Sequence, residues 1–263
     1  MSGGHLPPNA SRLRRESSLM VKFRKGGITV KKGKIIAIEA GDASGKATQA
    51  RLLFEKLKEI YLDKVHLISF PRYSSESSFF VREYLSGNFG NLSEIGKKEA
   101  ALFYAMDRYA SYHKEWKELY ESGDVFVMDR YVPSNIVHQA AKDMEDENTN
   151  QLSDSQRNFC DWVENLEYRI LNLPAPDAVI FLDMDIDASL RLLEERAKEN
   201  KREKDIHEKN TDYLRKVHRC YQLFAKEKEW FRIHCCDTIG NISPIEEIQA
   251  WVLALSRNVL ARD

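Results

Sequence analysis

Short apolar runs alternate along the chain with longer stretches of helical periodicity. The runs are rich in Ile, Val, Leu and Phe, as buried strands are, and they are KIIAIEA (34–40), KVHLISF (64–70), DVFVMDR (124–130), DAVIFLDMD (177–185) and WFRIHCCD (230–237). In the stretch 48–62, Leu52, Leu53, Leu57 and Ile60 recur at helical spacing. Alternating strands and helices predict an α/β fold with a five-stranded, mostly parallel sheet between two helical layers.

Charged residues follow several of the predicted strands. Glu39, the segment FPRY (70–73), Asp129–Arg130 and Asp183 all stand at or after the end of an apolar run. Right-handed crossovers place such strand ends along one edge of a parallel sheet, where ligands bind in folds of this kind. We therefore expect the functional site at that edge.

The composition is that of an ordinary globular chain. The 263 residues are 43% hydrophobic and 31% charged, enough for one sizeable α/β domain. A net charge of −1 gives no general attraction to nucleic acid or to a membrane surface, so we expect neither as a partner. No apolar run approaches the roughly 18 residues of a membrane-spanning helix.

The cysteines indicate a reducing compartment. Four cysteines in a chain of this length do not make a disulfide framework. The pair Cys235–Cys236 in HCCD (234–237) has no second Cys/His pair at zinc-finger spacing, so we expect buried strand residues rather than metal ligands.

Residues 1–33 differ from the rest of the chain. They are rich in Gly, Pro and Ser, then basic, with Glu16 as their only acid. This composition predicts a disordered extension ahead of a domain at 34–263. A basic, acid-poor start is also typical of an organelle transit segment. We expect a cytoplasmic protein, with a mitochondrion-type organelle as the alternative.

The segment IEAGDASGKATQA (38–50) resembles a phosphate-binding loop with two departures. The usual pattern is G-x-x-x-x-G-K-[ST]. Gly45 and Lys46 match it, whereas Ala40 replaces the first Gly and Ala47 replaces the hydroxyl residue. The loop lies between a predicted strand and a predicted helix, which is the context that the motif requires. Thr48 offers a hydroxyl one position later.

The loop can bind a polyphosphate even with these departures. Its backbone N–H groups and the helix N-terminus attract anions, and the Lys46 ammonium suits the β and γ phosphates. We expect Ala40 to adopt ordinary extended dihedral angles, because Ala is strained at positive φ. The loop residues that we expect to bind ATP are Gly41, Asp42, Ala43, Ser44, Gly45, Lys46, Ala47 and Thr48.

The segment VMDRYVPSN (127–135) adds a second element of phosphate chemistry. Asp129 follows three apolar residues, as a Walker-B carboxylate does near a metal and its waters. Arg130 beside it can neutralise a phosphate on the acceptor. The alternative is an Asp that caps a helix and pairs with the neighbouring Arg.

Several segments in this order resemble the thymidylate kinase family: IEAGDASGKATQ, FPRY, LFYAMDRY and DRYVPSNIVHQ. DWVENLEYRILNLPAPDAVIFLDM and KDIHEKNTDYLRKV continue the resemblance, which covers roughly residues 33–255. It implies a P-loop NTPase fold with a helical lid and transfer of the ATP γ-phosphate to dTMP, giving dTDP. It also implies Mg²⁺ as cofactor and a homodimer. The same resemblance makes Lys46, Asp42, Arg130, Asp129 and a lid arginine the candidate catalytic residues.

The resemblance also implies an acceptor site. Tyr104 would stack on thymine and Arg108 would bind the base; the two stand four residues apart, on one helix face. Without the resemblance, core packing would be the favoured interpretation of Tyr104, since the apolar residues Leu102, Phe103 and Met106 surround it. We expect His138 to pack near the sugar rather than act as a base. The full dTMP-binding set is Asp42, Phe70, Arg72, Tyr73, Tyr104, Arg108, Arg130, Ser134, Asn135, His138 and Glu208.

The charged run at 191–208 corresponds to the lid that closes over ATP in the family. The alternative is a solvated helix face with i,i+4 ion pairs. Ala43 and Ser44 leave the phosphate loop without a cation of its own, so the lid should supply one, with Arg196 as our first candidate. The next candidates are Lys201 and Arg202, and the acidic residues expected near the acceptor phosphate or its metal are Asp205 and Glu208.

Ala47 weakens direct metal ligation by the loop. We expect Mg²⁺ to be held mainly by ATP oxygens and waters, with Thr48 and Asp129 as the candidate protein contacts. Two other functions fit the motifs less well. One is another nucleoside monophosphate or deoxynucleoside kinase, in which Glu39 would serve as the base for a neutral hydroxyl. The other is a catalytically weak nucleotide-binding paralogue, which Ala40 and Ala47 would explain.

Overall fold

The computed structural model describes residues 32–200 and 205–262. The predicted extension up to residue 31 and the lid candidates Lys201 and Arg202 lie outside this description. Gly33 is the first residue anchored to the sheet layer. Its N–H donates to the Tyr120 carbonyl over 2.7 Å, and a Cβ at this position would lie 2.4 Å from the Asp124 carbonyl oxygen.

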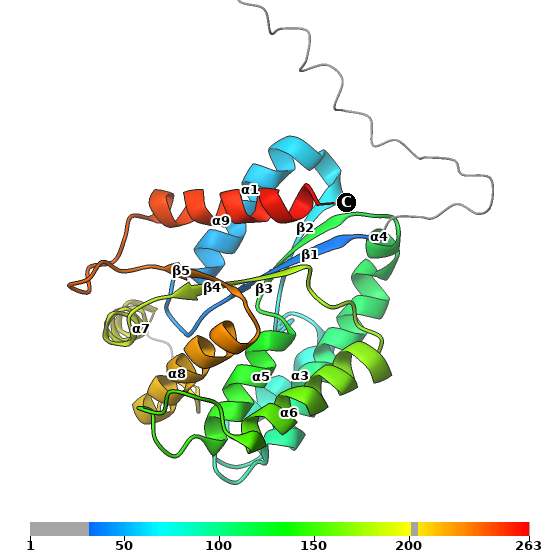
Figure 1. The fold of residues 1–263 in the computed structure, drawn as a ribbon. Coiled ribbons are helices and arrows are strands. Elements are labelled where there is room, and N and C mark those ends of the chain that lie inside the picture. Colours follow the sequence, from blue (N-terminus) through cyan, green and yellow to red (C-terminus); the bar gives the residue numbers. More distant parts are fainter. Residues whose placement is uncertain (1–31, 201–204, 263) are drawn as a thin grey trace, which may run out of the picture. The chain divides into compact units, whose positions relative to one another are not determined.

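A five-stranded sheet forms the centre (Figure 1). Its strands are β1 (Lys34–Glu39), β2 (Val65–Ser69), β3 (Val125–Asp129), β4 (Ala178–Asp183) and β5 (Phe231–His234). The order is β2-β3-β1-β4-β5 and every pairing is parallel. All five predicted strands are confirmed, and the mostly parallel sheet proves parallel throughout.

Helices cover both faces of the sheet, which confirms the three-layer prediction (Figure 1). One face carries α1 (Lys46–Tyr61) and α9 (Ile245–Leu260). The other carries α3 (Lys97–Ser111), α5 (Val132–Ala140), α6 (Asp154–Glu164) and α8 (Thr211–Glu227). The remaining helices are α2 (Phe79–Leu85), α4 (Lys117–Glu121) and α7 (Ile186–Asn200).

Short irregular helices extend several of these elements. In the part of the chain that the structure describes, single 3₁₀ turns lie at Leu62–Lys64, Glu76–Ser78 and Ala141–Asp143. Two π-helical segments, at Tyr112–Trp116 and Asn165–Ile170, continue α3 and α6 directly. Such π segments occur often at functional sites.

Two apolar clusters hold the layers together. In the strands, alternate residues point to opposite faces, so Ile36 and Ile38 pack towards α1 and α9, whereas Ile35 and Ala37 pack towards the other layer. Both faces of the inner strands are therefore buried, which explains why their sequences read as continuous apolar runs.

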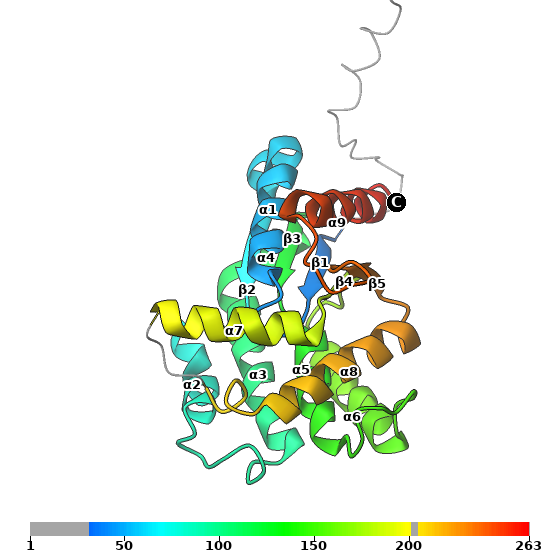
Figure 2. The ribbon, with the colours of Figure 1, turned by 90° about the vertical axis from the view of Figure 1, so that its left-hand side faces the viewer.

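The helix α7 lies at the edge of the layers rather than on a face of the sheet, and Figure 2 views the molecule from its side. It begins just after β4 and covers much of the predicted lid segment. No helix among the described residues is long and apolar enough to cross a membrane.

Candidate active site

The predicted phosphate loop connects β1 to α1. Gly45, immediately before α1, has a φ of 74°, in the left-handed region that glycine adopts without strain. Ala43 also has a positive φ, of 55°, whereas Ala40 does not, as expected. The Ser44 hydroxyl donates to the Gly41 carbonyl over 2.7 Å and closes the turn. The loop thus leads directly into a helix N-terminus, where backbone N–H groups favour anions.

The Lys46 ammonium pairs with the carboxylate at the end of β3. Its Nζ lies 2.7 Å from Asp129 Oδ1. The pairing follows from the sheet, because β1 and β3 are neighbours and Ile38 is in register with Asp129. Burial lowers the pKa of Lys46 and nearby Arg130 lowers it further, whereas Asp129 opposes this shift. The lysine of the phosphate loop and the carboxylate in the Walker-B position, Asp129, therefore lie side by side.

Arg130 joins the phosphate loop to the neighbouring cavity. Its backbone φ of 66° is unusual for a residue with a side chain, and such strain gathers at functional sites. The guanidinium donates to Asp42, to the Ala40 carbonyl over 3.2 Å and to Ser134 Oγ over 3.2 Å. Burial opposes ionisation of Asp42, but Arg130 outweighs it, and the pKa of Asp42 falls from 3.8 to about 2.

The neutral form of His138 supports the Arg130 guanidinium. Burial lowers the pKa of His138 well below its usual value, and the positive charge of Arg130 adds to the shift. The ring Nε2 lies 3.3 Å from Arg130 Nη1 and accepts from it. The Tyr213 hydroxyl holds the same turn by donating to the His138 carbonyl over 2.8 Å.

A cavity of about 520 Å³ opens beside Arg130. We call it the acceptor cavity, and it is lined by Asp42, Phe70, Pro71, Tyr73, Leu85, Tyr104, Arg108, Arg130, Tyr131, Ser134, Asn135, His138, Asp205 and His207. All of the predicted acceptor residues except Arg72 and Glu208 are in its wall. Tyr104 and Arg108 face it together, as their spacing on α3 predicts.

Arg72 and Glu208 are not among the residues that line the acceptor cavity. The guanidinium of Arg72 pairs with Glu115 over 2.5 Å, and its backbone N–H donates to Asp107 over 2.8 Å. Glu208 is buried, and its carboxylate accepts from the Asp205 N–H over 3.2 Å. The side chain of Arg196 is exposed on α7.

The last residues of the predicted lid segment also reach the acceptor cavity. The Ile206 N–H donates to the Leu85 carbonyl over 3.2 Å, and His207 Nε2 lies 3.1 Å from the Tyr84 hydroxyl. Burial lowers the pKa of His207 to about 4, whereas burial raises the pKa of Asp205 to about 6. His207 was not predicted from the sequence, because nothing local links it to a cavity built mainly by earlier residues.

A buried carboxylate behind the cavity was also missed. Glu167 lies on the π-helical segment after α6, fully buried, and binds Arg108 through two contacts of 2.6 Å. The same carboxylate accepts from Asn135 Nδ2 over 3.0 Å. It stands far from both partners along the chain, so no local spacing could indicate these contacts.

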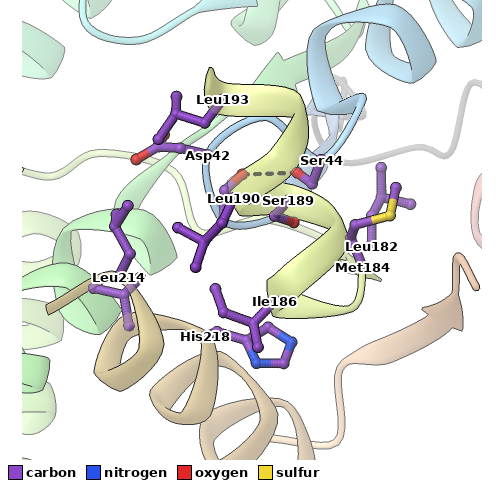
Figure 3. A pocket seen from close by; sticks show the side chains of 12 residues that line it. Asp42, Ser44, Leu182, Met184, Ile186, Ser189, Leu190, Leu193, Leu214 and His218 are labelled. Carbon is purple, nitrogen blue, oxygen red and sulfur yellow. Dashed lines mark hydrogen bonds between the residues drawn. The ribbon is translucent and has the colours of Figure 1, made fainter. Parts of the chain in front are cut away.

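A second cavity, of about 380 Å³, lies between the phosphate loop, α7 and α8 (Figure 3). Leu190 and Leu193 of α7 and Leu214 of α8 make it largely apolar. Asp42 belongs to both cavities. Among the residues that the structure describes, no Lys or Arg lines the second cavity, so a phosphorylated acceptor fits the acceptor cavity better.

The cysteines meet the expectation of buried residues only in part. Cys235 follows the end of β5 and is buried, and burial raises the pKa of its thiol to about 12. Cys236 is partly exposed, with its Sγ 3.4 Å from Met184 Sδ. All four cysteines are free thiols.

Oxygen ligands at the phosphate loop suit a magnesium ion. Asp129 offers a carboxylate beside Lys46, and Ser69 Oγ lies 3.4 Å from its second oxygen. Thr48 is partly exposed in the first turn of α1. Mg²⁺ typically takes one or two carboxylates together with phosphate oxygens and waters, so the residues present fit.

The family model and the relatives that match this chain all describe thymidylate kinases. The sequence model of the family described as thymidylate kinase matches residues 38–243. The chain is 29% identical over 198 residues to the thymidylate kinase of Mycobacterium tuberculosis (strain H37Rv), covering 73% of this chain and 86% of that protein. It is 29% identical over 224 residues to a probable thymidylate kinase of Methanocaldococcus jannaschii, covering 85% and 96%.

Solved structures of thymidylate kinases have a similar fold. The structure of thymidylate kinase from Candida albicans superimposes with a TM-score of 0.61 at 24% identity, covering 86% of this chain and 92% of that one. A thymidylate kinase from Ehrlichia chaffeensis gives a TM-score of 0.57 at 20% identity, covering 86% and 99%. These structural matches support the P-loop NTPase fold.

Proposed function

The chain belongs to the thymidylate kinase family, and from that premise we propose that the phosphate loop binds ATP and the acceptor cavity binds dTMP. The reaction transfers the γ-phosphoryl group of ATP to the phosphate of dTMP and yields dTDP and ADP. The observation that carries the assignment of the two sites is Arg130, whose side chain contacts both the loop, at Asp42 and Ala40, and the cavity.

Transfer of this kind requires positioning and charge neutralisation more than covalent chemistry. Lys46 would contact the β and γ phosphates of ATP, releasing part of its bond to Asp129. Arg130 would hold the acceptor phosphate in line with the γ-phosphate. Asp42, between them, fixes the Arg130 guanidinium and can accept from a sugar hydroxyl. No general base is needed, because the attacking oxygen already belongs to an anionic phosphate.

The opposite end of the cavity would receive the base. Tyr104 and Phe70 offer aromatic faces, and Arg108 and Asn135 offer polar groups. A mostly apolar wall with a few polar groups is typical of small-molecule sites. Thymine is the base that the family implies.

Mg²⁺, when bound with ATP, neutralises charge on the phosphates. Asp129 and Thr48 are the residues that would lie nearest to it, directly or through waters. Lid closure would bring Arg196 to the transferring group and exclude water, which would otherwise accept the phosphoryl group.

A deoxynucleoside kinase is less consistent with the site. It would need a base for a neutral hydroxyl, and Glu39 is the nearest candidate. Glu39 is fully buried and accepts from the Tyr131 N–H over 2.8 Å and from Ser134 Oγ. With its oxygens bound inside the protein, it supports the backbone around Arg130 instead.

The variant Arg130→Ala tests this assignment. We expect kcat/KM for dTMP to fall at least about 100-fold, because the acceptor phosphate loses its buried cation. Arg157→Ala, which removes an exposed ion-paired arginine, is the matched control and should leave the rate unchanged. Circular dichroism would verify that both variants fold. An Arg130→Ala enzyme with normal kcat/KM for dTMP would overturn the proposed acceptor site.

A further inference from the structure

Glu39 is a buried carboxylate close to Arg130 that the proposed reaction does not use. It is the last residue of β1 and has no exposed surface. Burying a carboxylate is costly unless charges and hydrogen bonds compensate for it. Burial raises the pKa of Glu39, and the charges of Arg130 and Lys46 only partly offset this shift. A role besides stability would explain why a carboxylate stands at this position.

Three hydrogen-bond donors surround the Glu39 carboxylate. Oε1 accepts from the N–H of Tyr131, the residue that precedes α5, over 2.8 Å. Oε2 accepts from the Ser134 hydroxyl and, over 3.2 Å, from the Tyr221 hydroxyl. A carboxylate that accepts several hydrogen bonds is favoured in its charged form. Glu39 thus joins the end of β1 to the start of α5 and to α8.

The charged carboxylate sets the direction of the Ser134 hydroxyl. A hydroxyl has one proton and two acceptor lone pairs, whereas a carboxylate oxygen only accepts. The Ser134 proton therefore lies on the bond to Glu39. The lone pairs of Ser134 Oγ are left for Arg130 Nη1, 3.2 Å away, and for the Tyr221 hydroxyl, 2.9 Å away. Glu39 thereby makes Ser134 an acceptor for the Arg130 guanidinium, which can only donate.

Glu39 acts on the backbone of Arg130 as well as on its side chain. The φ of 66° at Arg130 is costly for a residue with a side chain and persists only where the surrounding contacts hold it. One such contact is the bond from the next N–H, that of Tyr131, to Glu39. The same carboxylate therefore holds both the strained backbone of Arg130 and, through Ser134, its guanidinium.

The Tyr221 hydroxyl connects this cluster to α8. Tyr221 is fully buried, and its ring stacks on that of Phe181 in β4, with the ring centroids 5.2 Å apart. Neither Tyr221 nor Glu39 lines the acceptor cavity, whereas Ser134 and Arg130 do. Glu39 and Tyr221 thus contact the wall of the cavity from behind, through Ser134.

We propose that Glu39 is a positioning residue that aligns the Arg130 guanidinium for phosphoryl transfer, acting through Ser134 and supported by Tyr221. The carboxylate holds Ser134 as an acceptor, and Ser134 holds Arg130 Nη1, so the orientation of the guanidinium is determined before a substrate binds. Preorganised donors of this kind act mainly on the transition state. The inference rests on the proposed assignment of Arg130 to the acceptor phosphate.

Glu39→Gln tests this role with almost no change in shape. The amide oxygen can still accept from the Tyr131 N–H, but the amide NH₂ group then faces Ser134 as a donor. The Ser134 proton has to leave this bond, and Ser134 becomes a poorer acceptor for Arg130. We expect kcat with dTMP to fall at least about tenfold in a coupled assay of ADP formation. The KM for dTMP should change by less than about threefold, because removing a negative charge does not weaken the attraction for a phosphate.

Asp124→Asn is the matched control. Asp124 is a buried carboxylate immediately before β3, at the opposite edge of the sheet, where it pairs with His66 over 2.7 Å. Its substitution should leave kcat unchanged. A kcat of Glu39→Gln within about threefold of the wild type would overturn the proposal, whether or not the KM for dTMP rises. A raised KM with an unchanged kcat would show a role in binding alone.

A double-mutant cycle tests whether Glu39 acts through Ser134. Ser134→Ala has no hydroxyl to orient, so adding Glu39→Gln to it should lower kcat further by no more than about threefold. A merely structural role of Glu39 would lower kcat by the same factor in both backgrounds. Equal factors in the two backgrounds would therefore refute the proposal.

Tyr221→Phe covers the case in which Glu39→Gln does not fold. It keeps the stacked ring and removes one of the hydroxyls that hold Ser134 and Glu39. We expect kcat with dTMP to fall at least about threefold, and an unchanged kcat would contradict the proposal. The control is Tyr112→Phe, at a buried tyrosine on the π-helical segment after α3, which should retain the wild-type rate.

Wild-type turnover of dTMP separates the two levels of inference. If the wild type does not phosphorylate dTMP, the proposed function fails, and the role of Glu39 fails with it. If the wild type phosphorylates dTMP and the Glu39 and Tyr221 variants keep its kcat, only the role of Glu39 is wrong.

Discussion

Ion pairs hold the charged side chains of the site before any substrate arrives. Lys46 is bound to Asp129, and Arg130 is bound to Asp42. Both of these cations are therefore pre-positioned beside a carboxylate. Preorganisation of this kind lowers the cost of stabilising charge in the transition state. A nucleotide phosphate would compete with these carboxylates for the same N–H donors.

The role of Lys46 in phosphoryl transfer can be tested by substitution. Lys46→Met keeps much of the side-chain stem but removes the charge, so kcat should fall by about 10²–10³ in a coupled assay of ADP formation. Lys56→Met, at an exposed position of the same helix, is the control and should retain the wild-type rate. A Lys46→Met enzyme with more than half of the wild-type kcat would exclude a role for this ammonium in transfer.

Asp205 provides a prediction about stability and pH. Burial raises the pKa of its carboxyl from 3.8 to about 6, so the fold favours the protonated form. The stability that this preference contributes is present below pH 3.8 and is lost as the pH rises through about 6. Asp205→Asn should therefore become more stable than the wild type between pH 4 and 7, by up to about 3 kcal/mol.

Urea unfolding of the two proteins at a series of pH values would measure this difference. The carboxamide oxygen of the Asp205→Asn variant can still accept from the N–H groups of His207 and Glu208, to which Asp205 Oδ1 is bound at 2.9 Å. Asp63→Asn, at an exposed position, should show no comparable trend. A stability difference that does not vary with pH would contradict the shifted pKa.

Contiguous motifs made most of the site predictable at residue level. Lys46, Asp129 and Arg130 stand at or after strand ends, where topology alone gathers them. Tyr104 and Arg108 are linked by one helical turn. Glu167 could not be predicted, because its contacts depend on where the end of α6 meets α3 and α5.

Arg72 shows the limit of reading a motif. It stands in the predicted FPRY segment, yet its guanidinium pairs with Glu115 rather than lining the acceptor cavity. The packing of the turn after β2 against the π-helical segment after α3 determines this contact, and no local sequence pattern encodes that packing.

At the scale of elements, the parallel sheet determines where the chemistry can occur. The five strands were predictable because both faces of the sheet are covered, so nearly every inner position is apolar. The loops after β1 and β3 lie side by side because these strands are neighbours. The edge position of α7 was not predictable, since its amphipathic pattern does not say which surface it meets.

The lid assignment gives the prediction for α7. Arg196 and Arg191 are both exposed on this helix, about one and a half turns apart. If Arg196 reaches the transferring phosphoryl group, Arg196→Ala should lower kcat about 10²–10³-fold, while Arg191→Ala should change it little. Single-turnover phosphoryl transfer would separate this effect from product release. If Arg196→Ala and Arg191→Ala transferred the phosphoryl group at the same single-turnover rate, Arg196 would have no role in the transfer step.

At the scale of the whole molecule, the proposed kinase domain accounts for the chain from residue 34 onward. We propose that it forms a homodimer, as the family implies. Leu102 and Met106, four residues apart on α3, are 40% and 45% exposed and present one apolar face. Met106→Glu should shift the protein from dimer to monomer in sedimentation velocity. A wild-type monomer at micromolar concentration would refute this proposal.

The acceptor that the enzyme phosphorylates is the most direct test of the proposed function. ADP formation from Mg-ATP would be measured with dTMP, dUMP, dCMP, dGMP, AMP, UMP and thymidine as acceptors. We predict strong turnover of dTMP, weaker turnover of dUMP and none of thymidine, which lacks the phosphate that Arg130 would hold. Turnover of thymidine without dTMP, or ATP binding with no turnover of any acceptor, would contradict the account.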